Sequence, residues 1–110
     1  MKIGDSEFDF CLTSRDLLRA KTNHVDLGDF QNDQLRKVAV DPIAAIESAF
    51  WLYQPKLKDA GVKTIDEFAD AVDQAGLNEF HNKFREVLAD FFPILATVIK
   101  EIKAATEAND

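Results

Sequence analysis

The sequence predicts a mainly α fold: a small helical domain of about five to six helices with a short N-terminal β-hairpin. Helix-start signatures occur at Thr13, Asp41 and Thr64, and apolar residues behind them recur at helical spacing. Strand-like alternation is confined to the N-terminus. The expected organisation is one domain over residues 1–110, made of a hairpin (1–12), a helical body (13–105) and a frayed tail (106–110).

Composition and charge exclude several classes of function. With 46% hydrophobic and 30% charged residues the chain has ordinary globular composition, so we expect it to fold. Its net charge of −7 argues against binding to nucleic acid or anionic membrane, because both require Lys and Arg clusters. The sequence has no apolar run of about 18 residues and no signal-peptide core, and Cys11 is its only cysteine. A cytoplasmic protein without an internal disulfide is expected.

The N-terminal residues read as a half-buried hairpin. Phe8, Phe10 and Leu12 alternate with other side chains, which predicts a strand over residues 7–12 paired with residues 1–3. Two strands are marginal alone, so the Phe face requires a helix against it.

Two helices are expected next. Thr13 to Asp16 forms a capping box that opens a helix to about Thr22. Residues 23–29 are predicted to form a loop, and residues 30–40 a second helix with a ragged apolar stripe.

The segment from Asp41 to about Gln54 is predicted to be the most buried helix. Asp41 suits the N-cap, and Pro42 suits the first helical position, where no N–H is needed. Its expected core side carries Ile43, Ile46, Phe50 and Tyr53, and its polar arc carries Glu47, Ser48 and Gln54. Trp51 falls on that polar arc. It either packs under a second layer, which is favoured, or is exposed for a partner.

Further helices are expected after Pro55. One more turn covers residues 56–60, and a capping box at Thr64 opens a helix over 65–75 that ends at Gly76. The core stripe of that helix is Ile65, Phe68, Ala69, Val72 and Ala75. A helix over 78–92 presents Phe80, Phe84, Val87, Leu88 and Phe91 to the core. Pro93 kinks it or starts another, with the apolar stripe Leu95, Val98, Ile99 and Ile102.

No enzyme signature is found, and we expect no catalytic residue, cofactor or metal. The carboxylates Asp66, Glu67, Asp70 and Asp73 share one helix face. Their favoured interpretation is a solvated face, because no calcium-loop spacing accompanies them. His24 and His81 lack ligand partners at zinc spacing. A nucleophile–base pair of Cys11 with either histidine is left as a minor alternative.

Several short stretches carry a family resemblance. They are Met-Lys-Ile-Gly-Asp with its hairpin, Leu-Thr-Ser-Arg-Asp-Leu-Leu, and Asp-Pro-Ile followed by Phe-Trp-Leu-Tyr. With the acidic helical remainder, the chain resembles small tail-assembly chaperones of long-tailed (siphovirus-like) bacteriophages and prophages. Residues 55–64 are longer than that pattern. The resemblance implies a protein of the bacterial host cytoplasm that binds the hydrophobic, helical tape-measure protein, recruits tail-tube subunits and self-assembles. Many such families also make a longer form by ribosomal frameshifting.

Two functional hypotheses follow. In the first, apolar side chains contact the client or another copy; the proposed contact residues are Phe50, Trp51, Tyr53, Leu95, Ile99 and Ile102. In the second, the chain is an acidic inhibitor or regulator that docks on a basic protein or mimics nucleic acid through Asp66, Asp70 and Asp73.

Overall fold

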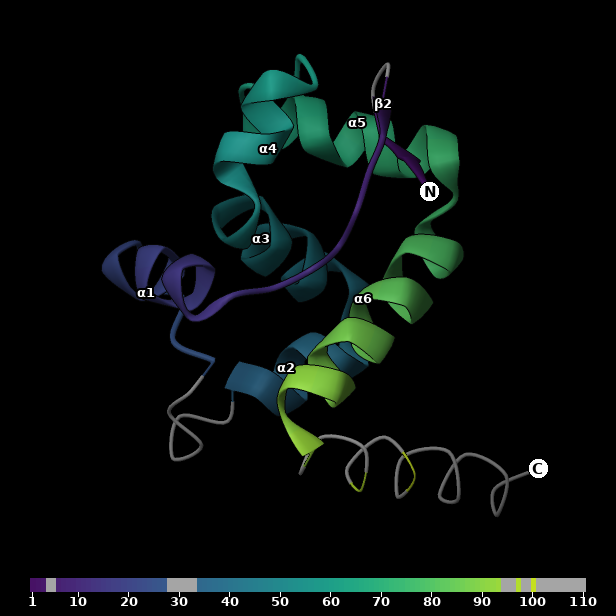
Figure 1. Ribbon diagram of the computed structural model, residues 1–110. Helices are drawn as coiled ribbons and strands as arrows, with labels where there is room; N and C mark the ends of the chain where they lie inside the picture. The colour runs from purple at the N-terminus through teal and green to yellow at the C-terminus, as the bar shows by residue number, and fades with distance from the viewer. Residues whose placement is uncertain (4–5, 28–33, 94–96, 98–99, 101–110) are drawn as a thin grey trace, which may run out of the picture.

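The structure, a computed structural model, describes residues 1–3, 6–27, 34–93, 97 and 100. Its elements are β1 (Lys2–Ile3), β2 (Ser6–Glu7), α1 (Ser14–Thr22), α2 (Gln34–Val40), α3 (Pro42–Leu52), α4 (Gln54–Asp59), α5 (Ile65–Ala75) and α6 (Leu77–Phe91). The predicted mainly α fold with an N-terminal hairpin is confirmed (Figure 1). Within the described residues, no helix is both long and apolar enough to cross a membrane.

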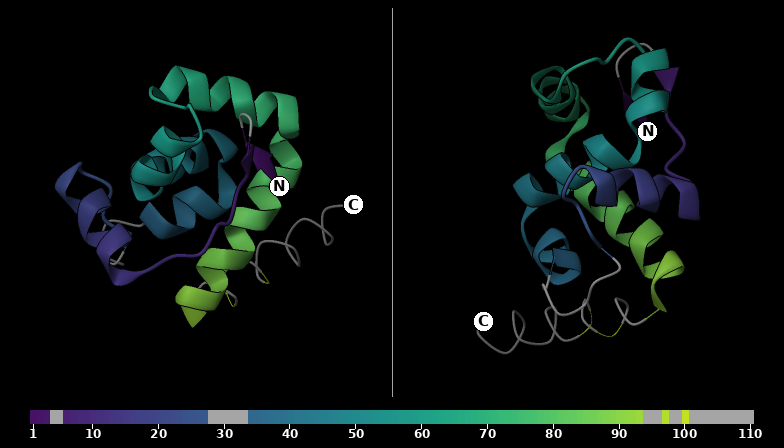
Figure 2. Two further views of the ribbon diagram at one scale, coloured as in Figure 1. Left: turned by 45° about the horizontal axis from the view of Figure 1, so that its top comes forward. Right: turned by 90° about the vertical axis from the view of Figure 1, so that its left-hand side faces the viewer.

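Helix α3 lies at the centre of the fold. It contacts α1, α2, α5 and α6 as well as the adjoining α4 (Figures 1 and 2). Its alanines, Ala44, Ala45 and Ala49, are buried, and such small side chains let neighbouring helices approach closely. Ser48 is fully buried and accepts a hydrogen bond from Gln34 Nε2 at 3.4 Å. Ser48 belongs to the predicted polar arc, and α2 covers that part of it.

The start of α3 has the predicted chemistry. Asp41 Oδ1 accepts a hydrogen bond from the Ile43 N–H at 2.9 Å, and Pro42 occupies the first turn. Ile43 itself is 65% exposed, so its predicted core position is wrong. Helical side chains tilt toward the N-terminus, and one in the first turn projects past the helices that cover the middle of α3.

The hairpin is shorter than the sequence pattern predicts. β1 and β2 pair antiparallel, with Lys2 opposite Glu7 and Ile3 opposite Ser6. Residues 8–12, here called the N-terminal arm, lie outside the strand and cross α3 toward α1 (Figure 1). The predicted strand over residues 7–12 was wrong, because β1 is only two residues long and pairs with only two residues of the second strand.

Helices, rather than a sheet, bury the aromatic side chains of the N-terminal arm. Phe8 and Phe10 are 7% and 6% exposed, and both lie edge-on to the Tyr53 ring at 5.3 and 5.4 Å. The Tyr53 hydroxyl donates to the Phe10 carbonyl at 2.6 Å. Burial raises the pKa of Tyr53 far above its ordinary value, so the hydroxyl remains a donor.

An aromatic cluster continues from the arm into α5 and α6. The ring centroids of Phe10 and Phe80 are 6.0 Å apart, those of Phe68 and Phe80 5.7 Å, and those of Tyr53 and Phe84 6.1 Å. Phe68, Phe80 and Phe84 are fully buried, as predicted. The Phe68–Phe80 and Tyr53–Phe84 pairs are edge-to-face, and such pairs add stability beyond the area that they bury.

Side-chain caps define the starts of α1, α3 and α5. Thr13 and Asp16 form the reciprocal capping box of α1, and Thr64 accepts from the Glu67 N–H at 3.1 Å. Gly76 separates α5 from α6 with a φ of +110°, a conformation that side chains with a Cβ rarely adopt. α4 follows Tyr53 directly, with Pro55 in its first turn. Part of the predicted 30–40 helix (30–33), the tail 106–110 and the stripe Leu95, Val98, Ile99 and Ile102 lie outside the described residues.

Two side chains of α6 cap the carboxyl end of α2. His81 Nε2 lies 2.9 Å from the Val38 carbonyl, and Arg85 Nη1 donates to the Ala39 carbonyl at 3.4 Å. His81 is 6% exposed, and its burial lowers its pKa, opposed by the hydrogen bond to Val38. A neutral imidazole therefore ties α6 to α2.

Tyr53→Phe is expected to lower the free energy of unfolding by about 1–2 kcal/mol, since the buried Phe10 carbonyl loses its donor while the ring remains. Urea denaturation followed by circular dichroism measures it. Thr22→Val, which removes an exposed bond to the Leu18 carbonyl, is the control and should change stability by less than about 0.5 kcal/mol. Equal effects of the two substitutions would contradict the role assigned to Tyr53.

Acid should destabilise the fold through His81. The ordinary histidine pKa is 6.5 and that of folded His81 is lower, so below 6.5 the unfolded chain binds a proton that folded His81 does not. The free energy of unfolding should therefore fall as the pH decreases through 6.5 toward the folded pKa. Denaturation between about pH 7.5 and pH 5 measures this slope. His81→Gln should show a shallower one, since carboxylates titrate alike in both proteins; coinciding slopes would exclude His81.

Candidate functional site

Two of the predicted contact residues are part of the core. Phe50 is 5% exposed and Tyr53 1%, and the Phe50 ring lies 6.4 Å from that of Phe68 on α5. In this fold both side chains are covered by the chain itself, because helices pack against α3 on several sides. Neither presents a surface to a partner.

Trp51 lies between the two alternatives set by the sequence. Its side chain is half-buried, packs against the core cluster and meets the Phe50 ring edge-on at 5.1 Å. The remainder of the indole is accessible to solvent. The other predicted contact residues, Leu95, Ile99 and Ile102, lie outside the described residues.

Five large apolar side chains are exposed among the described residues. They are Leu18 (66%), Val40 (53%), Ile43 (65%), Ile65 (38%) and Phe91 (36%). Ile65 and Phe91 were predicted to face the core; each lies in a terminal turn of its helix, beyond the elements that cover the middle. Val40 and Ile43 flank Asp41 at the α2–α3 junction, whereas Leu18 and Phe91 border hollows in the surface.

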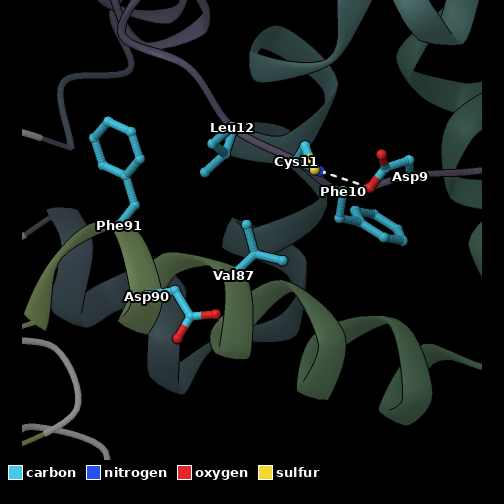
Figure 3. Close-up of a pocket in the computed structure, with 7 residues that line it drawn as sticks. All are labelled: Asp9, Phe10, Cys11, Leu12, Val87, Asp90 and Phe91. Carbon is cyan, nitrogen blue, oxygen red and sulfur yellow. Dashed lines mark hydrogen bonds between the residues drawn. The ribbon is translucent and has the colours of Figure 1, made fainter.

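The first hollow, of about 330 Å³, lies between the N-terminal arm and α6. Figure 3 shows Leu12 and Cys11 along one edge, with Val87 and Phe91 along the other, and the Phe91 ring rising toward the arm. Asp9 and Asp90 also line it, one at each edge. The hollow is thus mostly apolar with two carboxylates beside it.

The second hollow, of about 530 Å³, lies between α1 and the residue that follows α6. Its apolar lining is Leu17, Leu18, Leu27 and Phe92, and its polar lining is Ser14, Lys21 and Asp26. Lys21 Nζ and Asp26 Oδ2 are 3.8 Å apart, an exposed ion pair that contributes little to stability.

The two hollows meet at a pair of aromatic rings. Phe91 lines the first and Phe92 the second, and their ring centroids are 5.1 Å apart in an edge-to-face arrangement. On the opposite side, Leu12 of the first hollow is separated from Ser14 of the second by a single residue. The apolar surface therefore continues from one hollow to the other.

Cys11 is a poor nucleophile in this environment. Its thiol is exposed, but the hydrogen bond with Asp9 and the charge of that carboxylate raise the Cys11 pKa. His81 is bonded instead to Val38, and His24 lies in the turn after α1 with a φ of +67°. The hydrogen bonds of the described residues join neither histidine to Cys11, so the structure gives no support to a nucleophile–base pair.

The acidic face of α5 is open to solvent. Asp66, Glu67, Asp70 and Asp73 are all exposed. In the part of the chain that the structure describes, no three His, Cys, Asp or Glu side chains are grouped as a metal ion would require.

Comparison of the chain with protein-family models, characterised proteins and solved structures gave no significant match. The candidate site therefore depends on the geometry described above. Its most specific feature is the apolar surface that Phe91 and Phe92 share.

The sequence holds a signal for that surface that periodicity alone missed. Leu17-Leu18 and Phe91-Phe92 are adjacent pairs, and neighbouring residues on a helix point about 100° apart. On the short α1 and at the end of α6, contact with the core on one side of the helix cannot bury two adjacent side chains. Each pair therefore leaves a side chain at the surface.

Leu18→Ala and Leu88→Ala remove the same atoms from an exposed and a fully buried helical position. We expect Leu18→Ala to change the free energy of unfolding by less than about 0.5 kcal/mol and Leu88→Ala to lower it by about 2–5 kcal/mol. Urea denaturation of the two variants and of the unaltered chain measures both changes. A cost for Leu18→Ala approaching that of Leu88→Ala would assign Leu18 to the core.

Proposed function

We propose that this chain is a non-enzymatic binding protein of the cytoplasm that covers the apolar face of a helical client, in the manner of a phage tail-assembly chaperone. The client implied by that resemblance is the tape-measure protein. The observation that supports the proposal is the continuous apolar surface around Phe91 and Phe92 on a chain of net charge −7.

Apolar and acidic surfaces serve different steps of such a function. An amphipathic helix gains free energy when its apolar side chains enter hydrophobic hollows. The negative exterior then keeps a complex with an insoluble client in solution.

A second candidate function rests on the α5 face. Its exposed carboxylates favour an acidic inhibitor or regulator that docks on a basic partner or mimics nucleic acid. That function depends on Asp66, Asp70 and Asp73 and not on the apolar hollows, so substitutions separate the two.

Co-expression with the tape-measure protein of the same genome tests the proposal. We expect the client to be soluble and to co-purify with this chain, and to be insoluble when expressed alone. The variant carrying Asp66→Lys, Asp70→Lys and Asp73→Lys should still solubilise the client, because the apolar surface is intact. A client that stays insoluble beside the unaltered chain would contradict the chaperone function, and loss of binding in the charge-reversed variant alone would favour the acidic-face function.

A further inference from the structure

We infer that the two hollows form one docking groove for an amphipathic helix of a partner protein, whose apolar stripe is flanked by Lys or Arg. The inference rests on the proposed function and adds to it the contact surface and the charge of the segment recognised. The groove is defined by Leu12, Leu18, Val87, Phe91 and Phe92.

The shape of the groove suits a helix. Hollows of about 330 and 530 Å³ lie on either side of the Phe91–Phe92 ring pair, whose centroids are 5.1 Å apart. Apolar anchors on a helix that are three or four, or seven, residues apart are separated by about 5 or 10 Å along its axis. Neighbouring anchors of one helix can thus enter the two hollows in turn, as in other helix-in-groove complexes.

The charges beside the groove indicate which charge the partner's residues carry on either side of their apolar stripe. Asp9 and Asp90 line the first hollow, and hydrogen bonds from Cys11 lower the pKa of Asp9, which keeps it ionised. In the second hollow the charge of Lys21 is matched by Asp26 at 3.8 Å. Lys56 lies close by, since its Nζ donates to the Cys11 carbonyl at 3.3 Å. Three carboxylates, Asp9, Asp26 and Asp90, therefore stand against two ammonium groups, those of Lys21 and Lys56. The rim keeps a net negative charge, and Lys or Arg on either side of an apolar stripe complements it.

Apolar side chains that line the groove are exposed to solvent, as expected for a surface that a partner protein covers. Leu18 is 66% exposed on α1, and Phe91 is 36% exposed at the end of α6, whose opposite face is buried. The partner helix would cover these two side chains. They are the expected centre of the interface, since the most buried apolar anchors dominate binding.

The test uses the full-length chain and a synthetic helical peptide with an apolar stripe flanked by lysines. Cys11, the only cysteine, is exposed and lines the groove, so a small fluorine label on its thiol reports occupancy by NMR. Calorimetry on the unlabelled chain gives the dissociation constant. We expect saturable binding with a shift of the fluorine signal, and at least about tenfold weaker binding of the same peptide with glutamates in place of lysines.

Leu18→Asp and Phe91→Asp should each weaken binding by at least about tenfold. Ile43→Asp is the matched control, because Ile43 is 65% exposed against 66% for Leu18 but lies at the α2–α3 junction. It should leave the affinity within about twofold. Circular dichroism confirms that each variant is folded.

If all variants bind the peptide equally, or if Ile43→Asp weakens binding as much as the other two substitutions, the proposed groove is wrong. A fluorine signal that shifts with protein concentration alone would assign it to a second copy. Binding that appears only after Leu95→Asp and Ile99→Asp would assign it to the chain's own carboxyl segment. Either result overturns the proposed partner.

The groove and the proposed function can fail separately. If Leu18→Asp and Phe91→Asp still solubilise the tape-measure protein, the function stands and the groove is wrong. If the peptide binds as expected but the tape-measure protein stays insoluble, the groove stands and the chaperone function is wrong.

Discussion

The hydrogen bond from the Tyr53 hydroxyl to the Phe10 carbonyl, 2.6 Å long and buried, is the contact on which the arrangement depends. It joins the N-terminal arm to the end of α3, and the Tyr53 ring also contacts Phe8, Phe10 and Phe84 of α6. Together with the Phe10–Phe80 ring contact, this side chain holds the arm against α6. Because the first hollow lies between those two elements, the core interaction determines the shape of the candidate binding surface.

The burial of α3 explains why the aromatic residues proposed from sequence are not the surface. Helices on several sides cover Phe50 and Tyr53 and leave only part of Trp51 accessible. A helix enclosed in this way carries few polar residues, and its alanines serve close packing. Apolar side chains reach the surface where a cover ends, in the last turn of α6, in the first turn of α3 and on the outer face of α1.

The surface therefore combines a scaffold held by side-chain contacts with exposed apolar side chains at the end of α6 and on the outer face of α1. His81 and Arg85 hold α6 against the carboxyl end of α2, and the aromatic cluster holds it against the arm. The Phe91–Phe92 pair projects from that fixed helix between two hollows. A preorganised apolar surface loses little conformational freedom on binding.

The sequence by itself determined the local features: the caps at Thr13, Asp41 and Thr64, the break at Gly76, and the buried face of Phe80, Phe84 and Leu88. Each depends on residues within one or two turns, so spacing and side-chain chemistry suffice. Only the tertiary structure decided that Ser48 is buried, that Ile43 and Phe91 are exposed, and that the arm packs on Tyr53 rather than in a longer strand. Burial at those positions depends on which neighbouring element covers a given turn, and no periodicity within a single helix contains that information.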